Sequence, residues 1–554
     1  METEKFAPNV EQLNFTDEEK HLVAPFFTNL NGGVFGITFL PPEVIGALCS
    51  RTSRAKDDLR AVFLKEFMKP FLEGDSTYSE SLKALVEFLH KYPVEVIFSN
   101  PKARDFYITW LAQFGDDSIA QMAGAHLVFS GISQIAIKHM EDMRVGLAPI
   151  EKSTRYVDYS TKVNGSYRYY TDPTLEGMGL KEEYVKAMDG LFETYTELMG
   201  QYMEFLKVKF PGEEERVLKT KAFDTLRGLL PMATLSQVAF FGNGQAFEYM
   251  INRSLDHKLG EIRWSAQKSF EELSKFIPAF LRRVETEPAK VYRNYLSGKS
   301  ERVREAITKS GYQAHIPTAK EPNVKLLEFD ADGENKIIAS LIFKETHEPF
   351  ELVLGKVRDM SESQKEDILK AAIKDRTVKY FKTPRAFENS FLRFEIVMNI
   401  GSWRDLHRHR MHTQEKQLFT IYNGFDVPES LREAGLGGKF IAAIQKTEEV
   451  FKKIEAKDKD LAQYATCMAH RVRFMQYQNM RAFFWEAELR TIAQGHPDYR
   501  DIEKEKVKLV QKIYPLLSKY LLADMGNYDF ARRGDTGAIQ RKEEELKKYF
   551  SGGK

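Results

Sequence analysis

The feature that most constrains the fold of this chain is an internal repeat. One copy reads LRGLLPMATLSQVAFFGNGQAFEYMINR and ends at Arg253, and the other reads AQYATCMAHRVRFMQYQNMRAFFWEAELR and ends at Arg490. Both copies contain an N-x-x-A-F core that begins at Asn243 or Asn479, an arginine ten or eleven residues later, and then a histidine. A chain of 554 residues is also too long for one ordinary core. The repeat therefore predicts two copies of one fold.

The spacing within the two copies is the same. Arg227 precedes Asn243 by 16 residues, and Gln463 precedes Asn479 by 16 residues. Upstream, a strand-like segment runs into a helix-like one in each half, AHLVFSGISQIAIKHMEDMR and FLRFEIVMNIGSWRDLHRHR. Apolar residues at steps of three and four predict long helices over 188–202 and 440–454. We expect an α+β (mixed α/β) class, each copy having a small antiparallel sheet and long helices.

The boundary between the copies is predicted where the apolar pattern fades. The segment from Ser300 to Val324 gains two prolines and is typical of a linker. The following VKLLEFDADGENKIIASLIF has the pattern of a strand, an Asp-Gly turn and a second strand. We therefore expect a first repeat over 1–315 and a second repeat over 322–554.

The overall composition excludes several classes of function. The 81 basic and 80 acidic residues leave a formal charge of +1, which favours neither nucleic acid nor an anionic membrane. The cysteines, Cys49 and Cys467, form no CxxC pair, which argues against a disulfide framework and fits a reducing, cytoplasmic location. No apolar stretch approaches membrane-spanning length and the N-terminus has no signal-peptide pattern, so we expect a soluble, unprocessed protein.

The most prominent motif of the second half is the triplet Arg408-His409-Arg410. Two guanidiniums beside an imidazole suit a diphosphate and a planar heterocycle. A solvated basic turn is the alternative. Zinc binding by His407, His409 and His412 is a further alternative, but no cysteine or carboxylate completes the ligand set.

The first half carries E-x-S-x-R-Y at Glu151, Ser153, Arg155 and Tyr156. A carboxylate, a hydroxyl and a guanidinium this close together suit a phosphate with a hydrogen-bonding base or sugar. Capping of a helix start, with an exposed arginine, explains the same pattern. Arg227 stands in the apolar context LRGLLP, where an arginine usually has a fixed anionic partner, either a ligand or a structural carboxylate.

Together these motifs resemble the flavin-dependent thymidylate synthases, whose signature joins R-H-R to S-x-N-E-x-S-x-R-Y, with a downstream R-x-x-x-P and an N-A-R…L-R…H block. The second half supplies R-H-R, and the first half supplies E-x-S-x-R-Y and the R-x-x-x-P element from Arg227 to Pro231. Where the first half should have R-H-R it reads Asp142-Met143-Arg144, and where the second half should have S-x-R-Y it reads Leu418-Phe419-Thr420-Ile421. Each half therefore lacks the motif that the other keeps.

The resemblance implies a division of roles between the copies. It makes the first repeat the nucleotide-binding half and the second the FAD-binding half. The substrate residues that it implies are Glu151, Ser153, Arg155, Arg227, Arg253, Arg404, Asp405 and Arg490, of which Ser153, Arg155 and Arg490 are also assigned to catalysis. The implied cofactor residues are Arg408, His409, Arg410, Asn479 and His496, with no metal.

The activity implied is FAD-dependent methylation of dUMP to dTMP, with methylenetetrahydrofolate as one-carbon donor and NADPH as reductant. Asp405 stands where the family usually has a glutamine, which leaves another pyrimidine nucleotide possible. The alternatives are a catalytically inactive flavin- or nucleotide-binding homologue that acts as a sensor or assembly partner, and a nucleic-acid-binding protein. Two fused copies standing for two subunits of the family tetramer imply a homodimer without nucleic-acid or membrane partners.

Overall fold

The computed structural model describes residues 2–74, 76–93, 101–102, 105–106, 109, 118–122, 124–314, 322–530 and 536–551. The chain forms two compact units. The first comprises Met1–Glu204, Thr225–Ile316 and Val427–Met468, and the second comprises Phe205–Asp224, Pro317–Asp426 and Ala469–Lys554. The units thus do not follow the predicted repeat boundaries, 1–315 and 322–554, because one segment of each repeat groups with the other unit.

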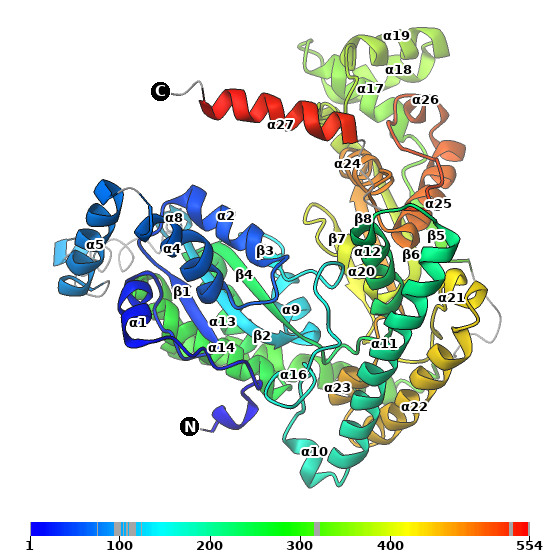
Figure 1. Cartoon of the computed structure of the whole chain (residues 1–554). Helices are drawn as coiled ribbons and strands as arrows, with labels where there is room; N and C mark the ends of the chain where they lie inside the picture. The colour runs from blue at the N-terminus through cyan, green and yellow to red at the C-terminus, as the bar shows by residue number, and fades with distance from the viewer. Residues whose placement is uncertain are drawn as a thin grey trace. The chain divides into compact units, whose positions relative to one another are not determined.

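The first unit contains a four-stranded antiparallel sheet in the order β1-β2-β4-β3. Its strands are β1 (Val34–Ile37), β2 (Gly124–Ser133), β3 (Leu147–Glu151) and β4 (Leu235–Asn243). Helices α13 (Gly244–Ser254) and α14 (Gly260–Leu273) pack against it (Figure 1). The other helices of the unit outside the long pair described below are α1 (Asp17–Val23), α2 (Pro42–Thr52), α3 (Leu59–Val62), α4 (Lys69–Leu72), α5 (Ser76–Lys91), α8 (Ser118–Met122), α9 (Gln134–Glu141), α10 (Thr174–Gly177), α15 (Pro278–Leu281) and α16 (Glu287–Lys309).

The second unit repeats this sheet in the order β5-β6-β8-β7. Its strands are β5 (Val324–Phe329), β6 (Phe391–Asn399), β7 (Thr413–Lys416) and β8 (Arg471–Asn479). Helices α20 (Ile400–Leu406), α24 (Met480–Arg490) and α25 (Pro497–Ile513) surround it. The remaining helices are α17 (Gly333–Phe343), α18 (Phe350–Asp359), α19 (Glu362–Ala372), α26 (Pro515–Ser518) and α27 (Thr536–Ser551), with α12 (Glu215–Leu226) ending at the division between the units. The two matching sheets confirm the predicted class of two copies of one α+β fold.

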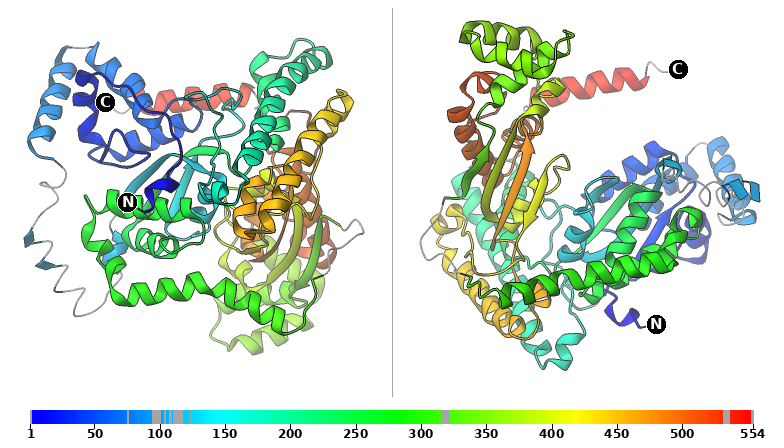
Figure 2. Two further views of the ribbon diagram at one scale, coloured as in Figure 1. Left: turned by 90° about the horizontal axis from the view of Figure 1, so that it is seen from below. Right: turned by 180° about the vertical axis from the view of Figure 1, so that it is seen from behind.

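The long helices of the two repeats lie side by side within the first unit, which contains the first of them as far as Glu204. They are α11 (Lys181–Lys209) and α22 (Gly437–Glu455), flanked by α21 (Glu429–Glu433) and α23 (Lys459–Ala462). Lys439 pairs with Glu197 and Lys453 with Glu183, so the helices run antiparallel (Figure 2). This pairing explains why the segment Val427–Met468 groups with the first unit.

Equivalent residues of the two repeats also pair with each other. Pro231 and Cys467, each four residues beyond Arg227 or Gln463, form an antiparallel bridge. The Met232 amide donates to the Thr466 carbonyl at 2.7 Å, and the Met468 amide donates to the Leu230 carbonyl at 2.9 Å. Because each repeat offers the same positions to the other, these two segments are related by a local two-fold axis.

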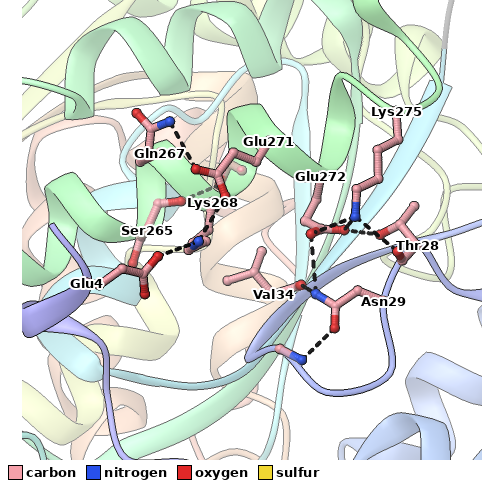
Figure 3. A network of polar contacts seen from close by, with 12 residues as sticks. Glu4, Thr28, Asn29, Val34, Ser265, Gln267, Lys268, Glu271, Glu272 and Lys275 are labelled. Atoms are coloured by element: carbon pink, nitrogen blue, oxygen red, sulfur yellow. Dashed lines mark hydrogen bonds and ion pairs between the residues drawn. The ribbon is translucent and has the colours of Figure 1, made fainter. Parts of the chain in front are cut away.

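The helix α14 is fastened to the N-terminal segment by a polar network (Figure 3). The carboxylate of Glu272 accepts hydrogen bonds from Thr28, from Asn29 and from Lys275. Asn29 also donates to the carbonyl of Val34, at the start of β1. Since Glu272 is only 6% exposed, these donors offset the cost of burying its charge and fix the helix against the edge strand.

Two sequence predictions about the boundary are wrong in detail. Helix α16 continues to Lys309, so the first part of the predicted linker from Ser300 is helical; its residues 315–321 lie outside the described residues. The expected second strand after Asp332 is helix α17, in which Ile337, Ile338 and Ala339 are buried. A short apolar run does not distinguish a buried helix from a buried strand, and here the helix prevails.

Candidate functional site

In both repeats a central strand runs directly into a short helix whose first turn is capped by the last strand residue. Ser133 caps α9 and Asn399 caps α20, while Asn243 and Asn479 cap α13 and α24. The Asn479 side-chain oxygen accepts from the Ala482 amide at 2.8 Å. This capping places the predicted cofactor residue Asn479 at a fixed strand–helix junction.

A carboxylate in the first turn of a later helix, Glu261 of α14 or Asp498 of α25, holds each of the first pair of caps. The Ser133 amide and hydroxyl donate to Glu261 at 2.7 and 2.5 Å, and the Asn399 amide group donates to Asp498 at 2.6 Å. Burial raises the pKa of Glu261 to about 7, against the hydrogen bonds from Ser133 that lower it. The two repeats therefore hold the start of the first short helix in the same way.

The R-H-R triplet follows α20, and its three side chains differ in exposure. Arg408 and Arg410 are exposed, whereas His409 is buried. Nε of Arg490 donates to Nε2 of His409 at 2.6 Å. Burial lowers the pKa of His409 well below its ordinary value and the Arg490 cation lowers it further, although Glu486 opposes both. The imidazole is therefore neutral, and it stands between two exposed arginine residues in the sequence.

Behind His409 lies a buried ionic network that connects β8 to α24 and α25. Lys506 donates to Glu486, to Glu503 and to the side-chain oxygen of Gln476, each at 2.9 to 3.0 Å. Gln476 also contacts Nδ1 of His412 at 2.9 Å. Burial disfavours the charge of Glu486, but the Lys506 cation holds its pKa below the usual range. Burial and the Glu486 charge raise the pKa of Glu503.

The other predicted residues of the second repeat have structural surroundings. Arg404 is buried and Asp405 is half-buried on α20, and His407 lies against Trp403 with ring centroids 4.6 Å apart. His496 caps α25, because its Nδ1 accepts from the Asp498 amide at 3.3 Å. Its other ring nitrogen lies 3.4 Å from the carbonyl of Asp224. The His496 ring is 6% exposed, and each of its nitrogens has a hydrogen-bond contact.

In the first repeat, Glu151 is part of a buried ion pair. Its carboxylate accepts from Gln134 at 2.7 Å and from Lys138 at 3.1 Å, and Lys138 also pairs with Glu141 at 2.6 Å. All these groups are buried. Glu151 therefore ties the end of β3 to α9.

Ser153 and Arg155 follow the end of β3 at Glu151. The Lys152 amide continues the β3–β4 ladder by donating to the Gln237 carbonyl at 2.8 Å, and Ser153 Oγ accepts from the Arg155 amide at 3.2 Å. Arg155 is 3% exposed. Arg227 is 4% exposed and begins the 3-10 turn Arg227–Leu229, as Gln463 begins the matching turn Gln463–Ala465. The exposed arginine of the capping alternative is therefore wrong, because Arg155 is buried.

Arg253 has a partner that mirrors the Arg490–His409 pair. Its guanidinium lies 3.0 Å from Asp142 and 3.6 Å from the sulfur of Met143. Asp142 and Met143 are the residues that stand where R-H-R would be. In each repeat, then, an arginine near the end of one short helix (α13 or α24) contacts the loop that follows the other short helix (α9 or α20).

The predicted residues separate into two sets. Glu151, Ser153, Arg155, Arg227 and Arg253 belong to the first unit, and the other predicted residues belong to the second. Sequence reasoning missed the network of Glu486, Glu503 and Lys506. The run EKEKVK resembles a solvated helix face, and only the packing of α25 shows that it is buried.

Neither cysteine is a ready nucleophile. Cys49 and Cys467 are buried free thiols, and burial raises the pKa of Cys49 to about 11 and that of Cys467 further. Within the described ranges, no group of three or more His, Cys, Asp or Glu side chains is placed to hold a metal ion. None of the helices in the described part of the chain is both long and apolar enough to cross a membrane.

Comparisons with known proteins agree with the repeat. A family model described as thymidylate synthase complementing protein matches residues 76–279 and 325–516, one range in each predicted repeat. The UPF0159 protein of Chlamydia muridarum is 34% identical over 529 residues, covering 94% of this chain and 97% of its own. That of Chlamydia pneumoniae is 33% identical over 528 residues, with the same coverage of 94% and 97%.

A more distant relative is the UPF0159 protein of Thermoplasma acidophilum, 26% identical over 524 residues, which cover 88% of this chain and 96% of its own. Among solved structures, the UMP/dUMP methylase PolB from Streptomyces cacaoi, bound with 5-Br dUMP, aligns with a TM-score of 0.31 and 12% identity. That alignment covers 36% of this chain and 94% of the other.

Proposed function

The chain belongs to the thymidylate synthase complementing protein family, the flavin-dependent thymidylate synthases, and we propose that it methylates dUMP to dTMP with FAD, methylenetetrahydrofolate and NADPH. The observation that carries the proposal is the complementary retention of the family's motifs. The first repeat keeps E-x-S-x-R-Y and the second keeps R-H-R.

The nucleotide is assigned to the first repeat. Arg155 and Arg227 are buried, and their surroundings lower the dielectric in which they would meet a phosphate. Ser153 adds a hydroxyl next to Arg155. The buried Glu151–Lys138 pair supports this assignment by fixing the strand from which the motif starts. Arg253, Arg404, Asp405 and Arg490 complete the proposed substrate set.

FAD is assigned to the second repeat, and the residues present fit the group. Arg408 and Arg410 are exposed cations that suit a diphosphate, and the neutral, buried His409 between them suits a ring. Asn479 and His496 are the further proposed contacts. When bound and reduced, FAD supplies the electrons that convert the transferred one-carbon unit to a methyl group.

In the proposed reaction, the chain's own residues orient the nucleotide and polarise its pyrimidine ring. Arginine contacts to the pyrimidine favour negative charge that develops on the base during transfer. The buried thiols support a reaction without a cysteine nucleophile. We also propose that two chains form a homodimer, so that four copies of the fold assemble.

Two measurements test this function. The purified protein should take up FAD and acquire flavin absorbance, and it should then release tritium from C5 of labelled dUMP. A protein that takes up no FAD would refute the enzyme assignment. A protein that binds FAD and dUMP but releases no tritium would instead be the inactive, sensor-type homologue.

A further inference from the structure

The first unit contains a cavity that the proposed reaction does not use. Its volume is about 570 Å³, within the range of small-molecule sites. Its walls include parts of the N-terminal segment, the later part of β2, the start of β4 and residues 159–171. None of the proposed nucleotide or flavin residues lines it.

Lys152 enters this cavity from inside the E-x-S-x-R-Y motif. It lies between Glu151 and Ser153, and side chains alternate along an extended segment, so it points to the other face. Lys152 is 7% exposed, and its ammonium donates to the carbonyls of Lys56 and Asp57 at 3.0 and 2.9 Å. A third N–H of the ammonium remains for another acceptor. Burial lowers the pKa of Lys152 to about 8.

Arg168 is the second cation of the cavity. Its guanidinium lies 4.3 Å from the ring centroid of Tyr159 and donates to the Asp158 carbonyl. Its Nε is buried and has no hydrogen-bond partner among the residues that the structure describes. The charge of Arg168 also lowers the pKa of Lys152, so the two cations lie close enough to repel, although the charge of Asp58 has a larger and opposite effect. Such an arrangement is stabilised by an anion.

The charges of the lining do not balance. Four cations face two carboxylates, namely Lys56, Lys152, Arg168 and Lys181 against Glu11 and Asp58. Asp58 is already neutralised by Arg60, which lies 3.0 Å from it, and Lys181 pairs with Glu176 at 2.9 Å. The remaining excess is positive and includes the buried Lys152.

Aromatic rings form another wall, contributed by Tyr159, Tyr167, Tyr169 and Tyr170. Tyr169 donates to Asp189 at 2.9 Å and Tyr170 to Asp172 at 3.3 Å, so the hydroxyl groups of these two tyrosines are anchored. We propose that this cavity is a second small-molecule site, which binds an aromatic anion, with Lys152 and Arg168 holding its carboxylate or phosphate and the tyrosines packing on its ring.

Calorimetric titration of the full-length protein tests this site with four probes: phenyl phosphate, benzoate, inorganic phosphate and benzyl alcohol. We expect an aromatic anion to bind, benzyl alcohol not to bind, and inorganic phosphate to bind at least tenfold more weakly than phenyl phosphate. The phenyl phosphate and benzoate arms distinguish a phosphate ligand from a carboxylate ligand. Failure of both to bind, or equal binding of benzyl alcohol, overturns the proposal.

Variants locate the binding. Lys152→Met and Arg168→Met should each weaken it at least tenfold, whereas Lys162→Met should not, because Lys162 is exposed and does not line the cavity. If a methionine variant unfolds, Lys152→Arg and Arg168→Lys keep the charge and should keep the binding. Unchanged affinity in Lys152→Met refutes the site.

Two further measurements are independent of these affinities: the uptake of protons on binding, and the affinity in variants of the proposed nucleotide and flavin sites. At about pH 8 the wild type should take up protons on binding, because an anion favours the charged amine, and Lys152→Arg should not. Arg155→Ala and Arg408→Ala should leave this binding intact, so failure of the proposed nucleotide or flavin sites is distinguishable from failure of this one.

Discussion

Nε of Arg490 donates a hydrogen bond to Nε2 of His409 across 2.6 Å, which joins a residue expected to serve the nucleotide to one expected to serve the flavin. The acceptor role fixes the neutral imidazole with its proton on Nδ1. A substitution of either residue should therefore affect the binding of both the nucleotide and the flavin.

Replacing Arg490 by methionine should raise the pKa of His409, because a nearby cation that disfavours the imidazolium is removed. Burial remains, so the pKa should stay below the ordinary histidine value. The His409 ring resonances, followed by NMR during a pH titration, report this directly. Arg481→Met on the same helix, whose native partner is Glu388, is the matched control and should leave His409 unchanged. A lowered or constant His409 pKa in Arg490→Met contradicts the contact.

Lys506→Met should destabilise the protein by about 3–5 kcal/mol, because it leaves Glu486 and Glu503 buried without their cation. Urea unfolding of the variant measures the loss. The exposed Lys508→Met should cost less than about 0.5 kcal/mol. Adding Glu503→Gln to Lys506→Met should recover part of the stability, and a double variant less stable than the single one would be inconsistent with the network.

Stability should fall as the pH rises through about 7, in part because of Glu261. Its folded pKa of about 7 exceeds the ordinary glutamate value of 4.5, so the native state binds the extra proton between these values. The contribution is complete below pH 4.5 and amounts to about 3 kcal/mol at 1.4 kcal/mol per pKa unit. Denaturant unfolding measures the free energy of unfolding at pH values from about 5 to about 8, which bracket that pKa. Between these values the free energy of Glu261→Gln should depend less on pH than that of the wild type. The exposed Glu305→Gln should keep the wild-type slope.

Asp142→Asn should change the free energy of unfolding by less than about 1 kcal/mol, because the Asp142–Arg253 pair is partly exposed, at 39% and 30%. Asp142→Arg should cost more, since it sets two cations together. Neither variant should alter the amount of FAD bound per chain. Loss of FAD in Asp142→Asn would place a flavin contact in the first repeat and contradict the division of roles.

The repeat could be predicted from the sequence because the residues that define it, helix caps and turns, act locally along the chain. The Asn243 and Asn479 caps and the turns at Arg227 and Gln463 keep one spacing, and the structure gives each pair the same secondary structure. Spacing survives divergence because the strand–helix junction needs a capping side chain at one position.

The ion-pair partners of buried charged residues could not be predicted from the sequence. Lys506 and Glu503 sit in a run of alternating charges whose burial depends on how α25 packs, and packing is a long-range property. The helix α17 was mistaken for a strand for a related reason, because burial on several sides erases the periodicity that separates the two.

Conversion of dUMP to dTMP, followed by chromatography, tests the central claim most directly. The wild-type chain with FAD, methylenetetrahydrofolate, NADPH and dUMP should form dTMP, and omission of FAD from the apoprotein should abolish it. Arg155→Ala should lose dUMP binding while keeping FAD, and Arg408→Ala should lose FAD while keeping dUMP binding. Absence of dTMP from a folded protein that binds both FAD and dUMP would contradict the account.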